Sequence, residues 1–199
     1  MTKLIDNERL EVVSVRTRPD LLPVIAEWLW HQWWKEEGRS LEETQAIYAE
    51  CCKEAGAPQT LILLANDMPI ATVTLARKDL DERPTLTPWL AGVCVIPARR
   101  GKGYIYHLLE AFDSACRQAS VKTAWLFTNT AERVYLRAGW RVVEIVDRAG
   151  KLPVTLMSRD YVQYQIPETL SRRGRFLLVL SGHNPGGAKV NFHPPALGI

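Results

Sequence analysis

Several features that would define a special class of protein are missing from this sequence. Its 199 residues carry 25 Lys and Arg against 22 Asp and Glu, so the net charge is only +3 and the strongly basic balance of a dedicated nucleic-acid binder is absent. No apolar run approaches the roughly 20 residues that span a bilayer, and MTKLIDNERLEVV lacks the pattern of a signal peptide. We therefore expect a cytoplasmic protein that binds neither nucleic acid nor membrane.

Cysteine is scarce and wrongly spaced for a metal site. The four cysteines are Cys51, Cys52, Cys94 and Cys116, and they form no CxxC pair and have no histidine nearby in sequence. Zinc sites need such spacing, and a cytosolic chain keeps its thiols reduced. We expect four packing residues and no metal.

What the sequence does contain is an ordered series of strand and helix patterns. Strands are predicted at 10–16, 59–67, 68–77, 89–96, 122–128, 140–146 and 152–159, and helices at 21–34, 40–52, 103–119 and 131–139. Ser40 followed by Glu43 forms a capping box, and Asn66-Asp67 separates the two strands of a hairpin. The order β, α, α, β, β, β, α, β, α, β, β predicts an α/β (α+β) fold, with a mixed, mostly antiparallel sheet of about seven strands and helices on both faces.

The composition changes beyond Asp160, where no regular pattern continues. We predict one domain over residues 1–160 and a C-terminal extension over 161–199. FLLVL, at 176–180, is predicted as an edge strand that pairs with its own sheet or with a neighbouring subunit, which leaves a homodimer as one arrangement.

The stretch VIPARRGKGYIYHLL, residues 95–109, has the layout of a phosphate site. An apolar strand ends at Ile96, basic residues and two glycines follow, and a helix begins near Gly103. Unpaired N–H groups and the positive end of a helix converge at such a turn. It is neither a P-loop, because GxxxxGK[ST] is missing, nor a dinucleotide-binding fingerprint, because no glycine stands at the last position.

Two segments resemble motifs of the GNAT superfamily of N-acetyltransferases. Arg100 to Ile105 resembles its acetyl-CoA pyrophosphate loop, Q/R-x-x-G-x-G/A, and Asn129 to Trp140 is similar to its N-x-x-A-x-x-x-Y-x-x-x-G-F/W segment. The element order resembles that fold over roughly residues 8–160. The resemblance implies acetyl-CoA as co-substrate and direct transfer of its acetyl group to a primary amine in a ternary complex, without a covalent enzyme intermediate.

The resemblance also implies the residues that hold acetyl-CoA. The cofactor-binding candidates are Val93, Cys94, Val95, Arg99, Arg100, Gly101, Lys102, Gly103, Tyr104, Ile105 and Asn129. Backbone groups of Val93 to Val95 are expected to pair with the pantetheine arm, and Gly92 to ease that approach. Asn129 would bond the same arm, or act only as a helix N-cap. Ile105 departs from the family pattern, because a β-branched side chain stands where glycine or alanine is usual.

Tyr135 matches the family tyrosine that protonates the leaving thiolate, a suitable role because a phenol with a pKa of about 10 remains protonated beside a thiol of about 8.5. As an alternative, Tyr135 is a core residue. The general base that deprotonates the acceptor amine is less defined. Glu82 is the candidate, with Asp81, Glu36 and Glu37 as alternatives.

The acceptor contacts are assigned to Trp33, Glu36 and Trp89, because aromatic rings and a carboxylate suit a cationic amine. That acceptor is a small-molecule amine or a protein amino group. A second interpretation is a CoA-binding or regulatory module with the same fold and little catalysis, which Ile105 and the missing base favour. A nucleic-acid binder is disfavoured by the modest charge.

Overall fold

The computed structural model describes residues 2–5, 8–52 and 56–161. The chain divides into two units, Met1–Gln163 and Tyr164–Ile199. The second unit lies outside the described residues, and with it the strand predicted at 176–180. The domain boundary at residue 160 and the role of the extension therefore stay predictions. In the described part of the chain, no helix is long and apolar enough to cross a membrane.

The centre of the first unit is a mixed sheet in the order β1-β2-β3-β4-β5-β6-β8-β7, eight strands within the described residues. The strands are β1 (Thr2–Ile5), β2 (Glu8–Ser14), β3 (Gln59–Ala65), β4 (Met68–Ala76), β5 (Trp89–Val95), β6 (Thr123–Thr128), β7 (Arg141–Arg148) and β8 (Lys151–Asp160). All neighbours pair antiparallel except β5 and β6. The mostly antiparallel sheet is confirmed. Only β1 was not predicted, because four residues are too few to show an alternating pattern.

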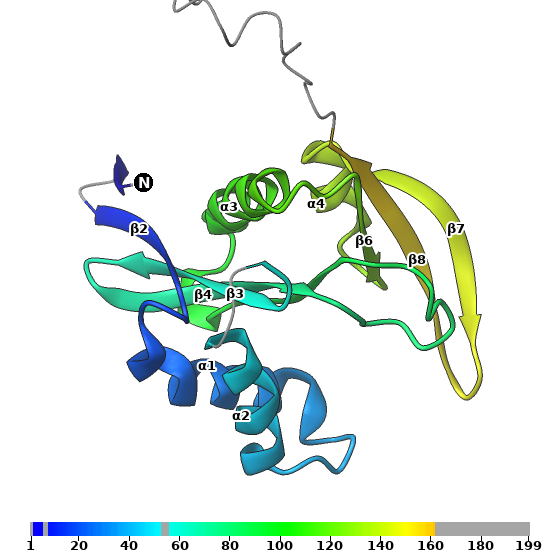
Figure 1. The fold of residues 1–199 in the computed structure, drawn as a ribbon, viewed down its shortest axis with the longest axis horizontal. Coiled ribbons are helices and arrows are strands. Elements are labelled where there is room, and N and C mark those ends of the chain that lie inside the picture. The colour runs from blue at the N-terminus through cyan, green and yellow to red at the C-terminus, as the bar shows by residue number, and fades with distance from the viewer. Residues whose placement is uncertain (1, 6–7, 53–55, 162–199) are drawn as a thin grey trace, which may run out of the picture. The chain divides into compact units, whose positions relative to one another are not determined.

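Helices cover both faces of this sheet (Figure 1). α1 (Leu22–Leu29) and α2 (Leu41–Ala49) lie on one face, and α3 (Tyr104–Gln118) and α4 (Glu132–Arg137) on the other. The capping box before α2 is confirmed, since Glu43 N donates to Ser40 Oγ at 3.1 Å and Ser40 N donates to Glu43 Oε2 at 2.8 Å.

The helix predicted over 21–34 is not one regular helix. A 3-10 turn at Pro19–Leu21 precedes α1, and the chain continues after Leu29 as a π-helical segment, Trp30–Trp34. The wider segment presents bulky aromatic side chains at the end of α1. A hydrophobic spacing of 3.6 residues does not distinguish such a segment from an α-helix.

The β3–β4 hairpin is confirmed. Asn66 and Asp67 both have positive φ, 49° and 65°, which is the backbone of a type I′ turn and suits Asn and Asp.

The core consists of buried side chains on both sides of the sheet. Leu108 and Phe112 of α3 pack on one face and Ile25 and Leu29 of α1 on the other. All four cysteines are free and belong to these clusters or pack against them. Burial raises the pKa of the Cys51, Cys94 and Cys116 thiols, as expected for packing residues.

Candidate active site

The parallel strands β5 and β6 pair at only one position and then diverge. Trp89 and Trp125 are the single pair in register, and Trp125 N donates to Pro88 O at 3.0 Å. On its other side β5 stays paired with β4 as far as Ala71↔Val95. Ile96 N donates to Ile70 O at 3.0 Å, so the alternating strand backbone turns the Val95 groups away from β4. The edge of β5 that faces β6 is therefore available to a ligand that pairs like a strand.

A bulge at Gly92 shapes this edge. The β4–β5 register shifts between Thr72 and Thr74, and Gly92 has φ +57°. A Cβ added there would lie 3.1 Å from Tyr48 Oη and 3.2 Å from Thr74 Oγ1. The bulge thus requires glycine both for its backbone conformation and for its close packing against α2.

The loop after β5 forms an open cradle at the start of α3. A 3-10 turn at Pro97–Arg99 leads into Gly101 and Gly103, with φ of +78° and +77°, and Gly103 is the N-cap of α3 without a capping side chain. A Cβ added at Gly101 would meet nothing within 4 Å, and one at Gly103 would meet only Tyr106 Cδ2 at 3.9 Å. Gly101, Lys102 and Gly103 are exposed. Backbone donors, a lysine and a helix N-terminus therefore surround free space, which fits a phosphate group.

Two side chains assigned to cofactor binding are instead anchored to β2. Arg99 donates to Glu8 Oε1 at 2.5 Å, and the Tyr104 hydroxyl donates to Glu8 Oε2 at 2.6 Å. Tyr104 is only 7% exposed. The side chains of Arg99 and Tyr104 stabilise the loop by binding β2. Only the backbone groups of these two residues therefore contribute to the cradle.

We expect Glu8→Gln to destabilise this loop in a pH-dependent way. The hydrogen bonds from Tyr104 and then Arg99 hold the pKa of Glu8 below its usual value of 4.5. A depressed folded-state pKa contributes stability above the unfolded pKa, and that stability is lost as the pH falls through the folded pKa. The melting temperature of the variant should be lower than that of the wild type at pH 7, and the gap should close below about pH 4. Glu11→Gln, on the same strand, is the control. A gap that stays constant with pH would contradict the role of Glu8.

Arg100 and Ile105 complete the loop. Arg100 Nε donates to Val95 O at 2.9 Å and its NH2 to Gln32 Oε1 at 3.3 Å, so the guanidinium lies at the point where β5 enters the cradle. Ile105 is half-buried and packs against the core beneath α3. Much of its side chain is therefore occupied with core packing, and less of it faces the cradle than its sequence position indicates.

Tyr135 lies on α4, the short helix that follows β6. Its side chain is 7% exposed and its ring meets Trp140 edge to face at a centroid distance of 6.4 Å. Burial, with a smaller effect of the Asp79 charge, raises the pKa of Tyr135 to about 12. Asn129 is exposed at the end of β6. Thr128 Oγ1 accepts from Ala131 N at 3.0 Å at the start of α4, so this cap does not occupy Asn129.

The structure disfavours Glu82 as a base. Arg148 Nε donates to Glu82 Oε1 at 3.3 Å. A backbone hydrogen bond and, less strongly, Arg148 hold the pKa of this carboxyl below its usual value despite partial burial. An ion-paired carboxylate of low pKa is a weak proton acceptor.

The sequence analysis missed Asp79, three residues before Glu82. Its side chain is reachable by solvent, yet the surrounding protein raises the pKa of Asp79 to about 7; Arg148 opposes this shift and Asp81 adds to it. The run KDLDER marks an acidic loop, but nothing in it indicates which carboxyl has a raised pKa.

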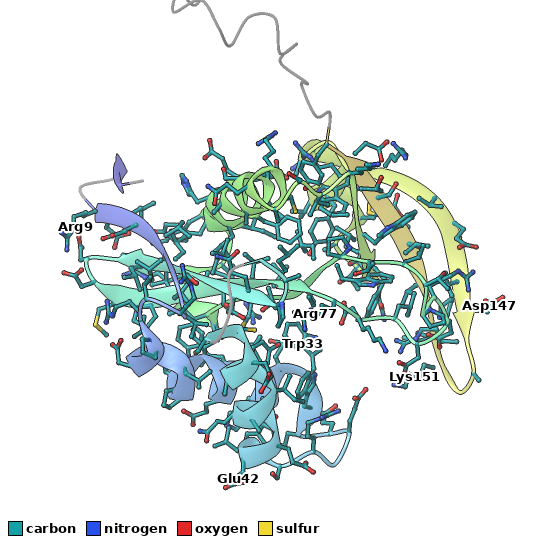
Figure 2. All side chains as sticks on the ribbon, in the orientation of Figure 1. Arg9, Trp33, Glu42, Arg77, Asp147 and Lys151 are labelled. Atoms are coloured by element: carbon teal, nitrogen blue, oxygen red, sulfur yellow. The ribbon has the colours of Figure 1, made fainter. Side chains whose placement is uncertain are left out.

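The acceptor candidates fall into two groups. Trp33, labelled in Figure 2, is 41% exposed. Glu36 is also exposed, and both residues lie between α1 and α2 in the chain. Lys151 Nζ lies 3.1 Å from Glu37 Oε1 and links the start of β8 to the same segment. Trp89, in contrast, is 0% exposed and donates from Nε1 to Leu86 O at 2.7 Å. Contact between Trp89 and an acceptor is therefore disfavoured, because the ring is part of the core.

A cavity of about 870 Å³ lies elsewhere, beside Pro88 at the start of β5 and Ala119 after α3. It does not include the cradle. Among the described residues, no group of three or more His, Cys, Asp or Glu side chains could hold a metal ion.

Known structures share this fold. An aminoglycoside 6′-N-acetyltransferase complexed with coenzyme A is similar with a TM-score of 0.63 at 12% identity, covering 78% of this chain and 99% of that one. The structure of yncA from Salmonella typhimurium with its cofactor acetyl-CoA gives 0.60 at 16%, covering 79% and 97%. A spermidine N-acetyltransferase SpeG chimera from Vibrio cholerae and hSSAT gives 0.59 at 16%, covering 76% and 95%.

The sequence itself gives the family. Residues 22–140 match the acetyltransferase (GNAT) family, and the chain belongs to it. The resemblance of the two motifs is thereby confirmed, and acetyl transfer with coenzyme A is the activity that this family supports. Among curated proteins, no sequence matches the chain.

Proposed function

We propose that this protein is an acetyl-CoA-dependent N-acetyltransferase that acts on a primary amine by direct attack in a ternary complex. One observation carries the proposal: the free edge of β5 runs directly into the open glycine cradle at the N-terminus of α3. A molecule with an extended amide arm and a diphosphate matches both parts. Acetyl-CoA has this composition, and its thioester supplies the acetyl group.

The residues present can hold such a co-substrate. Backbone N–H groups from Gly101 to Ile105 and the Lys102 ammonium suit the diphosphate. The backbone groups of Val93 and the N–H of Val95 face the arm, because the alternating strand backbone turns them away from β4, whereas Val95 O already accepts from Arg100 Nε. Asn129 is exposed at the end of β6, where it is free to bond the same arm. Cys94 packs toward α1 and α2 and its thiol pKa is raised by burial, so we assign it no nucleophilic role.

Tyr135 is proposed as the acid. When the amine attacks the acetyl carbon, the C–S bond breaks and sulfur leaves with the bonding electrons. A phenol that keeps its proton up to about pH 12 can donate it to this sulfur. The surplus proton on the new amide nitrogen then returns to the phenolate.

The acceptor is proposed to be a cationic amine, either a small molecule or a protein amino group. Exposed Trp33 offers a ring face and Glu36 a carboxylate, which attract an ammonium group. Aminoglycosides and spermidine, which the names of similar structures mention, are the first acceptors to test. We also retain a cytoplasmic location and a homodimer as proposals.

Calorimetric titration with acetyl-CoA tests the cradle. We expect wild-type protein to bind with a dissociation constant in the micromolar range, and Ile105→Gly to bind up to about tenfold more tightly, because a smaller side chain leaves more room for the diphosphate. A tenfold change corresponds to about 1.4 kcal/mol.

The control is Ile47→Gly, an exposed isoleucine on α2 away from the loop. Binding by the wild type, followed by thiol release with one of the amines, supports the proposed enzyme. Binding without release from any amine favours the catalytically weak CoA-binding or regulatory module. Absence of acetyl-CoA binding in both the wild type and Ile105→Gly would contradict the proposed function.

A further inference from the structure

A cluster of three polar side chains, which the proposed mechanism does not use, connects α3 with the end of β8. Arg159 Nη2 lies 2.9 Å from Asp113 Oδ2, and the Tyr161 hydroxyl donates to Asp113 Oδ1 at 2.9 Å. Asp113 and Tyr161 are buried. Both oxygens of a buried carboxylate are thus bonded, which gives the cluster one defined geometry and holds Arg159 in place.

The same arginine also reaches α4. Arg159 Nη1 donates to Ala138 O, the carbonyl of the C-cap residue of this helix. A Cβ added at Gly139 would lie 3.2 Å from Arg159 Nη1, so the guanidinium packs directly against the turn that ends α4. The carbonyls of a last helical turn have no partner within the helix, and the N–H fork of an arginine suits them. Arg159 therefore joins α4 to Asp113 of α3.

A side chain of β8 holds the other end of α4 as well. Thr155 Oγ1 donates to Glu132 Oε2 at 3.2 Å, in the first turn of the helix. α4 has only six residues, and a helix of this length is not stable without tertiary contacts. The position of α4 therefore depends on the residues that bind its two ends.

The end of α4 that Arg159 binds is also bonded to Tyr135. Ala138 N and Trp140 N each donate to Tyr135 O at 3.0 Å. The Tyr135 ring meets the ring of Trp140 edge to face, and Trp140 directly follows Gly139. A movement of this turn is thus transmitted to the phenol, and a fixed turn fixes the phenol.

The phenol and the proposed co-substrate belong to parts of the sheet that share little backbone bonding. Acetyl-CoA is assigned to β5 and to the start of α3, whereas Tyr135 follows β6, and β5 pairs with β6 in register only at Trp89↔Trp125. Hydrogen bonds of the sheet therefore contribute little to the separation of thioester and phenol. Figure 1 shows α3 and α4 on the same face of the sheet. The contact from Asp113 through Arg159 to α4 links these helices directly, and α3 carries the cradle at its N-terminus.

We propose that Arg159 is a positioning residue that holds α4 and so keeps the Tyr135 hydroxyl within reach of the leaving sulfur, an inference that rests on the proposed N-acetyltransferase function. Asp113 and Tyr161 orient the guanidinium. Arg159 has no contact with either substrate in this proposal, and the proton still passes from Tyr135 to sulfur and from the amide nitrogen back to the phenolate. Proton transfer needs a heavy-atom distance of about 3 Å, so a displacement of about 1 Å slows it.

Arg159→Lys tests this role, because lysine keeps the charge beside Asp113 but replaces a planar fork by a single ammonium. It cannot bind Asp113 and Ala138 O in the same geometry. With the amine that gives the fastest thiol release, kcat should fall about tenfold, while the dissociation constant for acetyl-CoA by calorimetry stays within about twofold. Hydrogen exchange of the backbone at residues 132–140, measured without acetyl-CoA, should become about tenfold faster, as expected for the loss of one hydrogen bond to a charged group. Exchange in α3 should stay as in the wild type.

A double variant separates the positioning of Tyr135 from other effects. If Arg159 acts through the Tyr135 hydroxyl, Arg159→Lys should lower kcat by less than about twofold when it is added to Tyr135→Phe. A loss of stability alone would lower kcat equally in both backgrounds. Arg18→Lys is the matched control, because Arg18 pairs with Asp20 at 2.7 Å just before α1, which covers the other face of the sheet. It should leave rate and exchange unchanged.

A second variant covers the case in which Arg159→Lys does not fold. Asp113→Asn keeps the shape of the side chain and replaces the ion pair with Arg159 by a weaker hydrogen bond. It should give the same pattern with a smaller decrease in kcat, about threefold.

Each outcome decides between the proposals. If the wild type turns over and Arg159→Lys keeps its full rate, or keeps the wild-type exchange in α4, the positioning role is wrong and the proposed function still holds. The same conclusion follows if the decrease in kcat is as large in the Tyr135→Phe background as in the wild type, or if Tyr135→Phe itself keeps full turnover. If the wild type releases no thiol with any amine, the proposed function fails, and this inference fails with it.

Discussion

Tyr135→Phe should lower kcat about 100-fold while acetyl-CoA binds within about twofold of the wild type. The phenol is 7% exposed on α4, and its pKa of about 12 keeps it protonated over the whole working range. Phenylalanine preserves the ring and its edge-to-face contact with Trp140, so only the hydroxyl is removed. Stopped-flow or steady-state thiol release measures the rate, and calorimetry measures the binding.

Tyr106→Phe is the control, because Tyr106 is a 40% exposed tyrosine on α3. It should keep full turnover and an unchanged melting temperature. If Tyr135→Phe also keeps full turnover, the hydroxyl gives no proton to the leaving thiolate, and Tyr135 is a core residue as the sequence analysis left open. A variant whose melting temperature falls together with its rate would indicate a structural effect.

Gly92→Ala should be the most destabilising single substitution near the site. The new methyl group combines a left-handed backbone at φ +57° with contacts of 3.1 Å to Tyr48 Oη and 3.2 Å to Thr74 Oγ1. Together these cost about 2–3 kcal/mol, which corresponds to a decrease of roughly 4–12 °C in melting temperature for a domain of this size. Acetyl-CoA should also bind more weakly, because relief of the contacts moves the edge of β5.

Gly150→Ala is the control that separates backbone strain from the close contacts of the added methyl group. Gly150, in the β7–β8 turn, has φ +70°, but a Cβ added there meets nothing within 4 Å. This variant should show only the backbone strain, about 1 kcal/mol, and unchanged acetyl-CoA binding. Equal losses of stability at both glycines would contradict the close packing of the bulge against α2.

The sequence predicted the order of elements and the cradle because both are local properties. The capping box at Ser40 and the Asn66-Asp67 turn depend on neighbouring residues, and the cradle depends on glycines followed by a helix. The local pattern did not reveal the role of Glu8, which lies 91 positions before Arg99 and binds it through the fold.

The assignments that failed to gain support concern side chains whose environment is set by distant segments. Trp89 was assigned to the acceptor because it is aromatic, but it belongs to a buried cluster with Val154, and Phe127 packs against its ring. Glu82 and Asp79 have similar surroundings in sequence. Arg148 lies on β7, 66 positions after Glu82, and pairs with Glu82. The pKa of Glu82 is therefore lowered, whereas that of Asp79 is raised. No local pattern carries this information.

The single register pair between β5 and β6 has a thermodynamic consequence. The sheet consists of two hydrogen-bonded ribbons, β1–β5 and β6–β8, with few backbone bonds across their boundary. The ribbons are held together by side-chain packing, largely through α3, and such a joint can open without disruption of either ribbon. A ligand that pairs with β5 and also contacts α4 bridges this boundary. Binding of this ligand therefore couples the two ribbons, which would otherwise fluctuate more independently. Its binding free energy makes their opening more cooperative.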